Sequence, residues 1–408
     1  MERTNKKSFL SILFVVAMDN FGFGIVFVMF APLLLTPEYS FLPADTSIAT
    51  RNLYLGILFA VFPLTQFLGA PLIGDFADIQ GRKKALYITI LGSVVSFLFS
   101  GLALLFSSLW GLIVSRLLAG FFAGNLSISL SAIADLSPTE KKRSHNFAII
   151  TVVMSLSWTF AMLSGGYLSN PAASKWLNPA LPLWLTAFLM LLSYFAVIKY
   201  YVETHQPVQG ARFDLTKGLH NIIQAFKMPK VRPFFFIILA WTIGWGLSVQ
   251  WFATYSILQF KATQIGIAWG LLIQGFFWLT GGLVINRLLL KRFTSLPIAV
   301  IAFGFCALFL LLCSLPSFYW SFAFIYWLSA LFASFSFSNS LNLVSINAPE
   351  GVQGKIMGLS QSMMSLGWIF VPILGGYIGA KHVDWLYPTS ALFLFFGFLI
   401  LAVKYWKK

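Results

Sequence analysis

Charged residues are scarce in this sequence of 408 residues, and acidic ones are the scarcest. Only 10% of the residues are charged, while 59% are hydrophobic. A water-soluble domain carries about 25% charged residues to cover its surface. The composition therefore excludes a chain of two or three soluble domains and predicts a protein buried in a membrane.

Cysteine is almost absent as well. Cys306 and Cys313 lie inside one apolar run, so the sequence offers neither a disulfide framework nor a Cys/His metal site. No motif combines a nucleophile, a base and an orienting residue, so we expect no catalytic residue, no metal and no cofactor. The first apolar run is longer than the apolar region of a signal peptide, which has about 7 to 15 residues. We therefore expect this run to stay in the mature protein.

Long apolar segments are what the chain does contain. A helix needs about 20 apolar residues to cross a hydrocarbon core about 30 Å thick. Barrel strands are about 10 residues of alternating polarity, and these runs are too long and too uniform for that. Twelve spans are predicted, at residues 9–35, 53–74, 85–107, 109–134, 147–168, 181–202, 234–257, 264–286, 296–315, 317–345, 356–380 and 385–404.

The longest polar interruption lies between spans 6 and 7. It divides the chain into a bundle at residues 1–202, a linker at 203–233 and a second bundle at 234–408. In the linker, apolar residues recur at spacings of about 3 and 4, which is typical of a helix lying along the membrane surface; they are Leu215, Leu219, Ile222, Ile223 and Phe226. We interpret this segment as a tether between the bundles rather than as a regulatory element.

Basic residues are unevenly distributed between the loops. On one side lie only Arg51, Lys175, Lys261 and Lys381, while the other side receives all the remaining loop and terminal Lys and Arg residues. Because cytoplasmic loops are enriched in Lys and Arg, both termini are predicted to be cytoplasmic. This asymmetry accounts for the formal charge of +15, and we expect no nucleic-acid partner.

Spans 5 and 11 carry an internal repeat. Residues 154–168 read MSLSWTFAMLSGGYL and residues 364–378 read MSLGWIFVPILGGYI, with eight identical positions. The paired glycines Gly165, Gly166, Gly375 and Gly376 are predicted to permit close helix packing. The repeat predicts a parallel duplication of a six-helix unit, as in one large class of secondary transporters.

The segment GDFADIQGRKK, residues 74–84, joins spans 2 and 3. It resembles the signature loop of the major facilitator superfamily at Gly74, Asp78, Gly81, Arg82 and Lys83. So short a turn requires glycine, and an aspartate there can meet a helix N-terminus or an arginine. The resemblance implies a gating latch between the two bundles. Phe76 and Ile79 depart from the pattern, so one charged arm of the latch is missing.

Other motifs extend the resemblance over the whole chain. RLLAGFFAGN in span 4 resembles the R-x-x-x-G-x-x-x-G pattern of the superfamily at Arg116, Gly120 and Gly124, with glycines spaced for helix packing. MDNFGFG at 18–24 and APEGVQGKIMGL at 348–359 are similar to tetracycline and multidrug exporters. The resemblance is closest to the drug:proton antiporter branch. It implies an all-α membrane protein of twelve transmembrane helices in two pseudo-symmetric six-helix bundles.

One departure concerns the direction of transport. That branch carries a Gly-Pro pair before the paired glycines of helix 5, and Ala161 and Met162 stand there in this chain. In the family the motif is associated with antiport. Membership is therefore better supported than export.

Two charged residues are predicted inside the membrane, Asp19 in span 1 and Arg116 in span 4. Asp19 lies about ten residues into its span, or about 15 Å deep. A charge at the centre of a helix costs about 2.5 to 3.5 kcal/mol, so we expect both side chains to face the bundle interior, a cavity or a partner. We hypothesise that Asp19 exchanges a proton during transport, with Arg116 assisting. The alternative is a static Asp19–Arg116 ion pair that holds two helices together.

Uncharged polar and aromatic residues are the candidates for substrate binding. They are Asn20, Gln250, Gln274, Asn339, Asn342, Trp241 and Trp245. Each has an alternative interpretation as a helix-packing residue. An aromatic-rich site with few charges favours lipophilic or zwitterionic substrates.

The sequence thus predicts a multi-pass transporter of a bacterial inner membrane or a plasma membrane. We expect its partners to be the lipid bilayer, protons and a small organic molecule, with a proton gradient as the energy source and a monomer as the functional unit. Proton-coupled efflux is the leading hypothesis. The alternatives are proton-coupled uptake of a nutrient or metabolite, and a non-transporting receptor or scaffold with the same fold.

Overall fold

The computed structural model describes residues 2–36, 39, 41–137, 139–171, 174, 176–203, 223, 227, 229–347 and 353–406. The predicted surface helix of the linker, apart from Ile223, lies outside the described residues, as do residues 348–352 of the motif before span 11. The chain divides into two compact units. Unit 1 comprises Met1–Leu33, Ser40–Pro43 and Val61–Lys217, and unit 2 comprises Leu34–Tyr39, Ala44–Ala60 and Gly218–Lys408.

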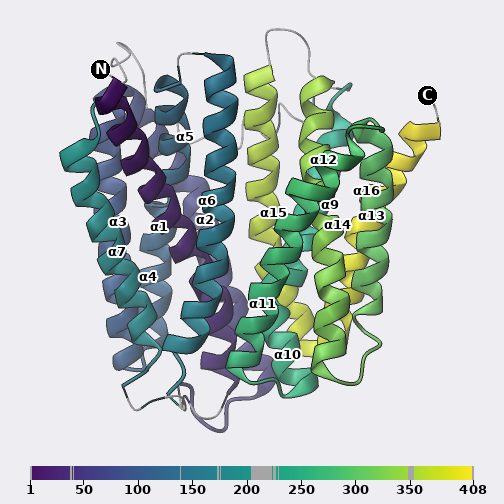
Figure 1. The fold of residues 1–408 in the computed structure, drawn as a ribbon. Coiled ribbons are helices and arrows are strands. Elements are labelled where there is room, and N and C mark those ends of the chain that lie inside the picture. Colours follow the sequence, from purple (N-terminus) through teal and green to yellow (C-terminus); the bar gives the residue numbers. More distant parts are fainter. Residues whose placement is uncertain are drawn as a thin grey trace. The chain divides into compact units, whose positions relative to one another are not determined.

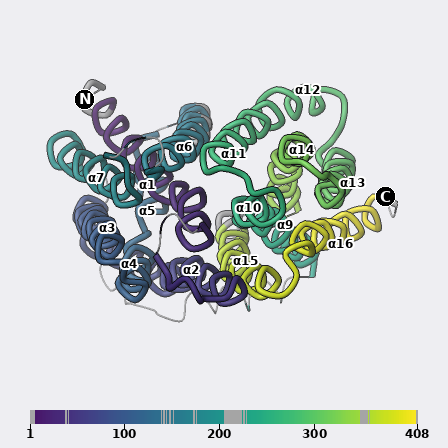
Figure 2. The backbone as a smooth tube through the Cα atoms, turned by 90° about the horizontal axis from the view of Figure 1, so that it is seen from below, coloured from purple at the N-terminus to yellow at the C-terminus, as the bar shows by residue number. Residues whose placement is uncertain are grey.

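Unit 1 is built from long apolar helices (Figure 1). They are α1 (Glu2–Leu35), α2 (Ile48–Gln80), α3 (Arg82–Leu105), α4 (Leu109–Phe121), α5 (Asn125–Asp135), α6 (Glu140–Leu168) and α7 (Ala180–Tyr200). The first part of α2 belongs to unit 2 and the rest to unit 1. Helix α3 packs against α4, α5 and α7, and the end-on view places α1 next to α5, α6 and α7 (Figure 2).

Unit 2 is also helical. Its elements are α9 (Arg232–Gln250), α10 (Phe252–Phe260), α11 (Gln264–Leu279), the π-helix η2 (Thr280–Ile285), α12 (Asn286–Leu289), α13 (Ser295–Leu312), α14 (Tyr319–Ile346), α15 (Gln353–Lys381), the 3₁₀-helix η3 (Val383–Trp385) and α16 (Leu386–Trp406). Helix α9 packs against α14, α15 and α16, and α13 packs against α14 and α16.

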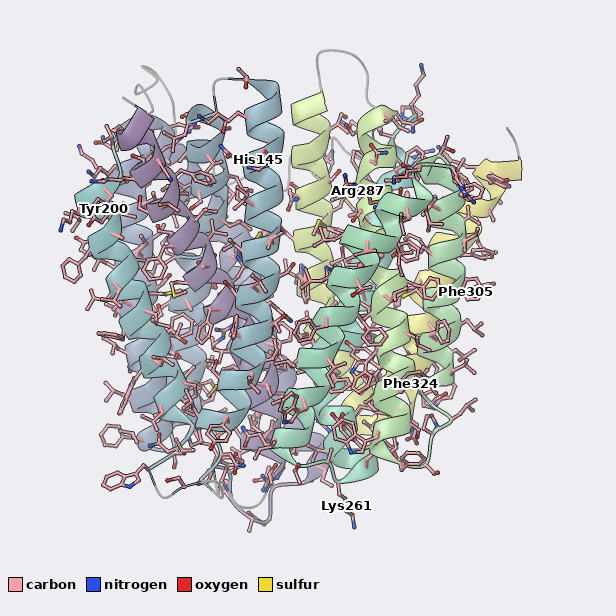
Figure 3. The ribbon with its side chains drawn as sticks, viewed as in Figure 1. His145, Tyr200, Lys261, Arg287, Phe305 and Phe324 are labelled. Atoms are coloured by element: carbon pink, nitrogen blue, oxygen red, sulfur yellow. The ribbon has the colours of Figure 1, made fainter. Side chains whose placement is uncertain are left out.

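Many of these helices have the length and apolarity of membrane spans. Within the described part of the chain, eleven helices are long and apolar enough to cross a membrane. The apolar stretch Val152–Leu168, inside the 29-residue α6, is shorter. Phe305 and Phe324 point outward from unit 2 (Figure 3) and are 45% and 52% exposed. In a membrane these exposed apolar faces lie against lipid, where no polar surface is required.

Helix starts follow ordinary capping chemistry. The side chain of Ser108 accepts a hydrogen bond from the Gly111 amide at 3.1 Å, and Thr263 accepts one from the Gly266 amide at 3.2 Å. Each bond satisfies a backbone donor that the first turn of a helix leaves unpaired. The short turns before α4 and α11 are therefore specified by local sequence.

Candidate functional site

Asp19 lies midway along α1 and contacts the beginning of α5. Its Oδ1 accepts a hydrogen bond of 3.0 Å from Nδ2 of Asn125. Asp19 is half-buried, whereas Asn125 is only 1% exposed. The neighbouring Asn20 is also half-buried, but its amide donates to Val16 O of its own helix at 3.0 Å. Within this pair of residues, only Asp19 bonds across to another helix.

The neighbours of α1 approach it closely at small residues. A Cβ on Gly22 would lie 2.7 Å from the Phe97 ring on α3, and one on Gly24 would lie 3.2 Å from Ala161 on α6. A Cβ on Gly165 of α6 would lie 2.8 Å from Ile25. Gly166 is buried as well. This tight packing restricts the position of α1, and therefore the position of Asp19.

Arg116 is buried on α4, with 3% of its surface exposed. Its guanidinium carbon lies 4.5 Å from the centre of the Phe62 ring and 5.7 Å from that of Phe30, and its Nε has no hydrogen-bond partner among the described residues. A desolvated cation–π contact contributes about 2 kcal/mol. This offsets most of the about 2.5 to 3.5 kcal/mol cost of a charge in mid-membrane.

Asp19 and Arg116 form no ion pair with each other in the described structure. Phe30, which touches Arg116, is eleven residues beyond Asp19 on α1, a separation of about 16 Å along the helix axis. The two charges therefore occupy different levels of unit 1. The static ion pair considered from the sequence is not present, and neither charge is neutralised by the other.

The fourth predicted span is interrupted between α4 and α5. Helix α4 ends at Phe121 and α5 begins at Asn125. The freed carbonyl of Ala123 accepts a hydrogen bond of 3.1 Å from Gln66 on α2. A Cβ on Gly120 would collide with the Phe62 carbonyl, and one on Gly124 would lie 2.7 Å from Ile73. These glycines therefore let α2 lie against the interruption at a distance that no larger residue permits.

The signature-like turn between α2 and α3 is anchored to the end of α7. Gly81 has φ +94°, which favours glycine, and a Cβ there would lie 2.6 Å from Oε2 of Glu203. The same oxygen accepts a hydrogen bond of 2.8 Å from the Lys83 amide, and Lys83 Nζ donates to Ile198 O at 3.2 Å. Glu203 thus caps the first turn of α3.

The remaining residues of this turn differ in their surroundings. Arg82 forms an ion pair with Asp135 at the end of α5. Asp78 is exposed, whereas Asp75, one turn earlier, is buried. A Cβ on Gly74 would meet nothing within 4 Å. The close geometry of the turn therefore depends on Gly81 and not on Gly74.

In unit 2, aromatic rings from α9, α11 and α14 form one cluster. The Trp245 ring is stacked on Tyr326 at 5.7 Å with an interplanar angle of 4°, and lies 5.4 Å from Trp278. Trp241 lies 6.5 Å from Trp245, and its Nε1 donates to Ser336 Oγ at 2.9 Å. Trp241 and Trp245 are 4% and 5% exposed. Both are therefore packed inside the bundle in this structure.

The polar candidates of unit 2 fall into two groups. Asn339 and Asn342 are engaged, because Asn339 Nδ2 donates to Asn286 Oδ1 at 2.7 Å and Asn342 Nδ2 donates to Ser295 Oγ at 2.6 Å. Gln250 and Gln274 are each 4% exposed, and their Oε1 atoms have no partner among the described residues. Buried acceptors without partners are uncommon in folded proteins, so the two glutamines retain hydrogen-bonding capacity.

The glycine pair of α15 lies at close helix contacts within unit 2. A Cβ on Gly375 would collide with the Trp251 indole, and one on Gly376 would lie 3.1 Å from the Cα of Gly56.

Among the described residues, no group of three His, Cys, Asp or Glu side chains is placed to hold a metal ion.

Sequence reasoning missed three residues that the structure places at these sites. Asn125 bonds Asp19, Glu203 caps α3, and Asp75 is the buried acid of the signature-like turn. Asn125 ends the glycine-containing motif of span 4, and this adjacency was the only available signal. Its bond to Asp19 joins residues 106 positions apart, and only the folded chain reveals it.

The fold is that of an all-α membrane protein with many spanning helices. Residues 10–372 match the sequence profile of the Major Facilitator Superfamily, so the chain belongs to this superfamily. It is an integral, multi-pass membrane protein of a family of transporters, not of enzymes.

Particular relatives are bacterial resistance proteins. Multidrug resistance protein 2 of Bacillus subtilis (strain 168) is 26% identical over 369 residues, covering 85% of this chain and 84% of the relative. Tetracycline resistance protein, class H, of Pasteurella multocida is 28% identical over 167 residues, covering 41% of this chain and 39% of the relative. The chain thus spans about two fifths of the length of that tetracycline resistance protein.

Solved structures show the same fold. The human organic anion transporter MFSD10 (TETRAN) has a TM-score of 0.71 at 17% identity, with 97% of this chain and 99% of that chain covered. The D-xylose-proton symporter has a TM-score of 0.74 at 15% identity, with 96% of each chain covered. At these identities the likeness concerns the fold alone.

Proposed function

We propose that this transporter couples the export of a small organic molecule to the entry of protons, and that Asp19 is the group that carries the proton. The observation that carries the proposal is a half-buried carboxylate in the middle of a membrane helix, bonded to an amide and not paired with Arg116. Ionisable residues inside membranes are costly and commonly mark proton or substrate pathways. A carboxylate exposed first to one side and then to the other can load and release one proton in each cycle.

Export is favoured over import by the relatives. Multidrug resistance protein 2 and the tetracycline resistance proteins carry names that associate them with drug resistance. The proposed orientation places both termini in the cytoplasm of a bacterial inner membrane or a plasma membrane, following the excess of Lys and Arg on that side. If the two fluxes are coupled as antiport, an inward proton gradient drives the substrate outward.

The energy available is sufficient for such a pump. Moving one charge through 100 mV releases about 2.3 kcal/mol. A free energy of 1.4 kcal/mol corresponds to about a tenfold ratio, so one proton supports a substrate gradient of about 40-fold. We propose that a monomer performs this cycle.

The proposed substrate is lipophilic or zwitterionic. Apart from Asn20 on α1, its candidate contacts lie in unit 2. There Gln250 on α9 and Gln274 on α11 retain unpartnered acceptors, and the same two helices contribute rings to the cluster of Trp241 and Trp245. Aromatic walls with a few hydrogen-bonding groups suit a small organic molecule better than a sugar or a multivalent anion. Asn339 and Asn342 are weaker candidates because each already donates to a neighbouring side chain.

The proposal is tested in proteoliposomes under an imposed pH gradient. Tetracycline, ethidium and the hits of a thermal-shift screen of drugs, amino acids and siderophores serve as probes. Wild type is expected to accumulate the probe against the proton flux, whereas Asp19→Asn is expected to exchange it without accumulation. Ser11→Ala, which changes a buried side chain of the same helix, is the matched control and is expected to behave as wild type.

Other outcomes separate the alternatives. Full accumulation by Asp19→Asn would overturn the assignment of the proton to this residue. Movement of the probe together with protons would establish uptake instead of export. No exchange of any screened solute by the wild type would favour a receptor or scaffold that shares the fold.

A further inference from the structure

The interruption of the fourth span changes which way its second half faces. Arg116 and Asn125 are nine residues apart, which is two and a half turns of an α-helix, so a continuous helix would direct them to opposite sides. In the structure both contact α1, Arg116 at Phe30 and Asn125 at Asp19. The interruption therefore turns the start of α5 toward α1.

Asn125 is fixed in this position by the backbone around it. It is the first residue of α5, directly after the glycine whose close contact with Ile73 excludes a larger side chain. Nε2 of Gln66 donates a hydrogen bond to the carbonyl oxygen of Ala123, two residues before Asn125. These contacts with α2 position the backbone at Asn125, from which its side-chain amide reaches Asp19.

The amide can bond either protonation state of Asp19. Its Nδ2 donates to the carboxylate at 3.0 Å, and its own Oδ1 is buried without a partner among the described residues. An asparagine amide has both donors and an acceptor, and a protonated carboxyl group has a donor. If Asp19 takes up a proton, rotation of the Asn125 side chain allows its Oδ1 to accept the new O–H.

Among the described residues, no ionisable group bonds Asp19. The helices around α1 carry such groups, but none forms a hydrogen bond or ion pair with Asp19 in the described structure. On the neighbouring helices these groups include Asp75 on α2, Tyr87 on α3, Arg116 on α4, Asp135 on α5, His145 on α6 and Tyr194 on α7. Asn125 is therefore the direct contact through which unit 1 can adjust the proton affinity of Asp19.

We propose that Asn125 is the positioning residue of the proton site. It orients Asp19 and sets the pH at which Asp19 exchanges its proton. Asn125 reaches Asp19 because the fourth span is interrupted. This inference rests on the proposed proton role of Asp19. A hydrogen bond to a charged group is about twice as strong as one between neutral groups. Asn125 therefore stabilises the carboxylate more than it stabilises the protonated acid.

The expected effect is a shift in the titration of Asp19. Without the amide, the carboxylate loses more stabilisation than the acid does, so the proton is held more tightly. We expect Asn125→Leu to raise the proton affinity about tenfold, which moves the midpoint about one unit toward higher pH. Asn125→Gln, which keeps an amide, is expected to shift it less.

The experiment follows the carboxyl C=O infrared band of the full-length protein in lipid vesicles as the pH is varied. It requires no substrate. The band that is lost in Asp19→Asn reports Asp19. Ser129→Ala is the matched control, because Ser129 is buried one turn further along α5 and its hydroxyl also lacks a partner among the described residues.

The outcomes distinguish this inference from the function on which it rests. A titrating band that disappears in Asp19→Asn, shifts in Asn125→Leu and stays in place in Ser129→Ala supports both. If the band disappears in Asp19→Asn but has the same midpoint in both Asn125 variants as in wild type, the role of Asn125 is wrong and the proton role of Asp19 survives. If Asp19→Asn removes no titrating band, both are overturned. Should Asn125→Leu fail to fold, Asn125→Ala, which also removes the donor, provides the same comparison.

Discussion

Gly120→Ala is the substitution whose effect follows most directly from the packing of unit 1. The added Cβ would collide with the Phe62 carbonyl and would lie 3.0 Å from the Phe62 carbonyl carbon. Both are backbone atoms of α2, so no side-chain rotation relieves the overlap and one of the two helices has to move. Overpacking of this kind costs about 1 to 3 kcal/mol of stability. Because the added Cβ meets backbone atoms, we expect a cost near the upper end of this range.

The intrinsic preference of alanine for helix reduces the net effect. Alanine is about 1 kcal/mol more favourable than glycine in a helix, which leaves a destabilisation of about 2 kcal/mol. For a domain of about 150 to 250 residues, each kcal/mol lowers the melting temperature by about 2 to 4 °C, so a fall of about 4 to 8 °C is expected.

Gly74→Ala is the matched control in the same unit. Gly74 is also helical, in α2, but a Cβ there would meet nothing within 4 Å. The same change of residue is therefore expected to leave the melting temperature unchanged or slightly higher. Thermal unfolding of both purified variants, followed by intrinsic tryptophan fluorescence, measures the difference. Equal melting temperatures would refute the argument from close helix contact.

Three other substitutions test separate parts of the structure by the same thermal measurement. Gly81→Ala places a side chain at φ +94° and 2.6 Å from Glu203; we expect a loss of about 1 to 3 kcal/mol, and a wild-type value would contradict the role of this turn. Trp241→Phe keeps a ring but removes the donor to Ser336, and is expected to cost about 1 kcal/mol; no loss would mean that this bond adds nothing net. Arg116→Met removes a buried cation, which costs about 2.5 to 3.5 kcal/mol, together with ring contacts that contribute about 2 kcal/mol; because these effects largely cancel, we expect a change of no more than about 1.5 kcal/mol. A large loss would reveal a partner for the guanidinium other than the rings.

The sequence alone determined the class of this protein, because hydrophobic content and segment length leave few alternatives for a chain with so little charge. The signature-like turn and the internal repeat were sufficient to indicate the superfamily, since both are local patterns of spacing. The position of Asp19 inside a membrane helix was also predictable, because depth follows from helix rise.

The tertiary structure decided which groups these residues contact. The sequence alone allowed an ion pair between Asp19 and Arg116. In the structure, Asp19 instead accepts a hydrogen bond from Asn125, and Arg116 packs against two phenylalanine rings. It also separated Gly81 and Gly120, which tolerate no Cβ, from Gly74, which does. Contacts of this kind join residues far apart in the chain and depend on the rotation of each helix about its axis. An apolar sequence specifies that rotation only weakly, because in a membrane nearly every face is hydrophobic and packing alone selects the face that turns inward.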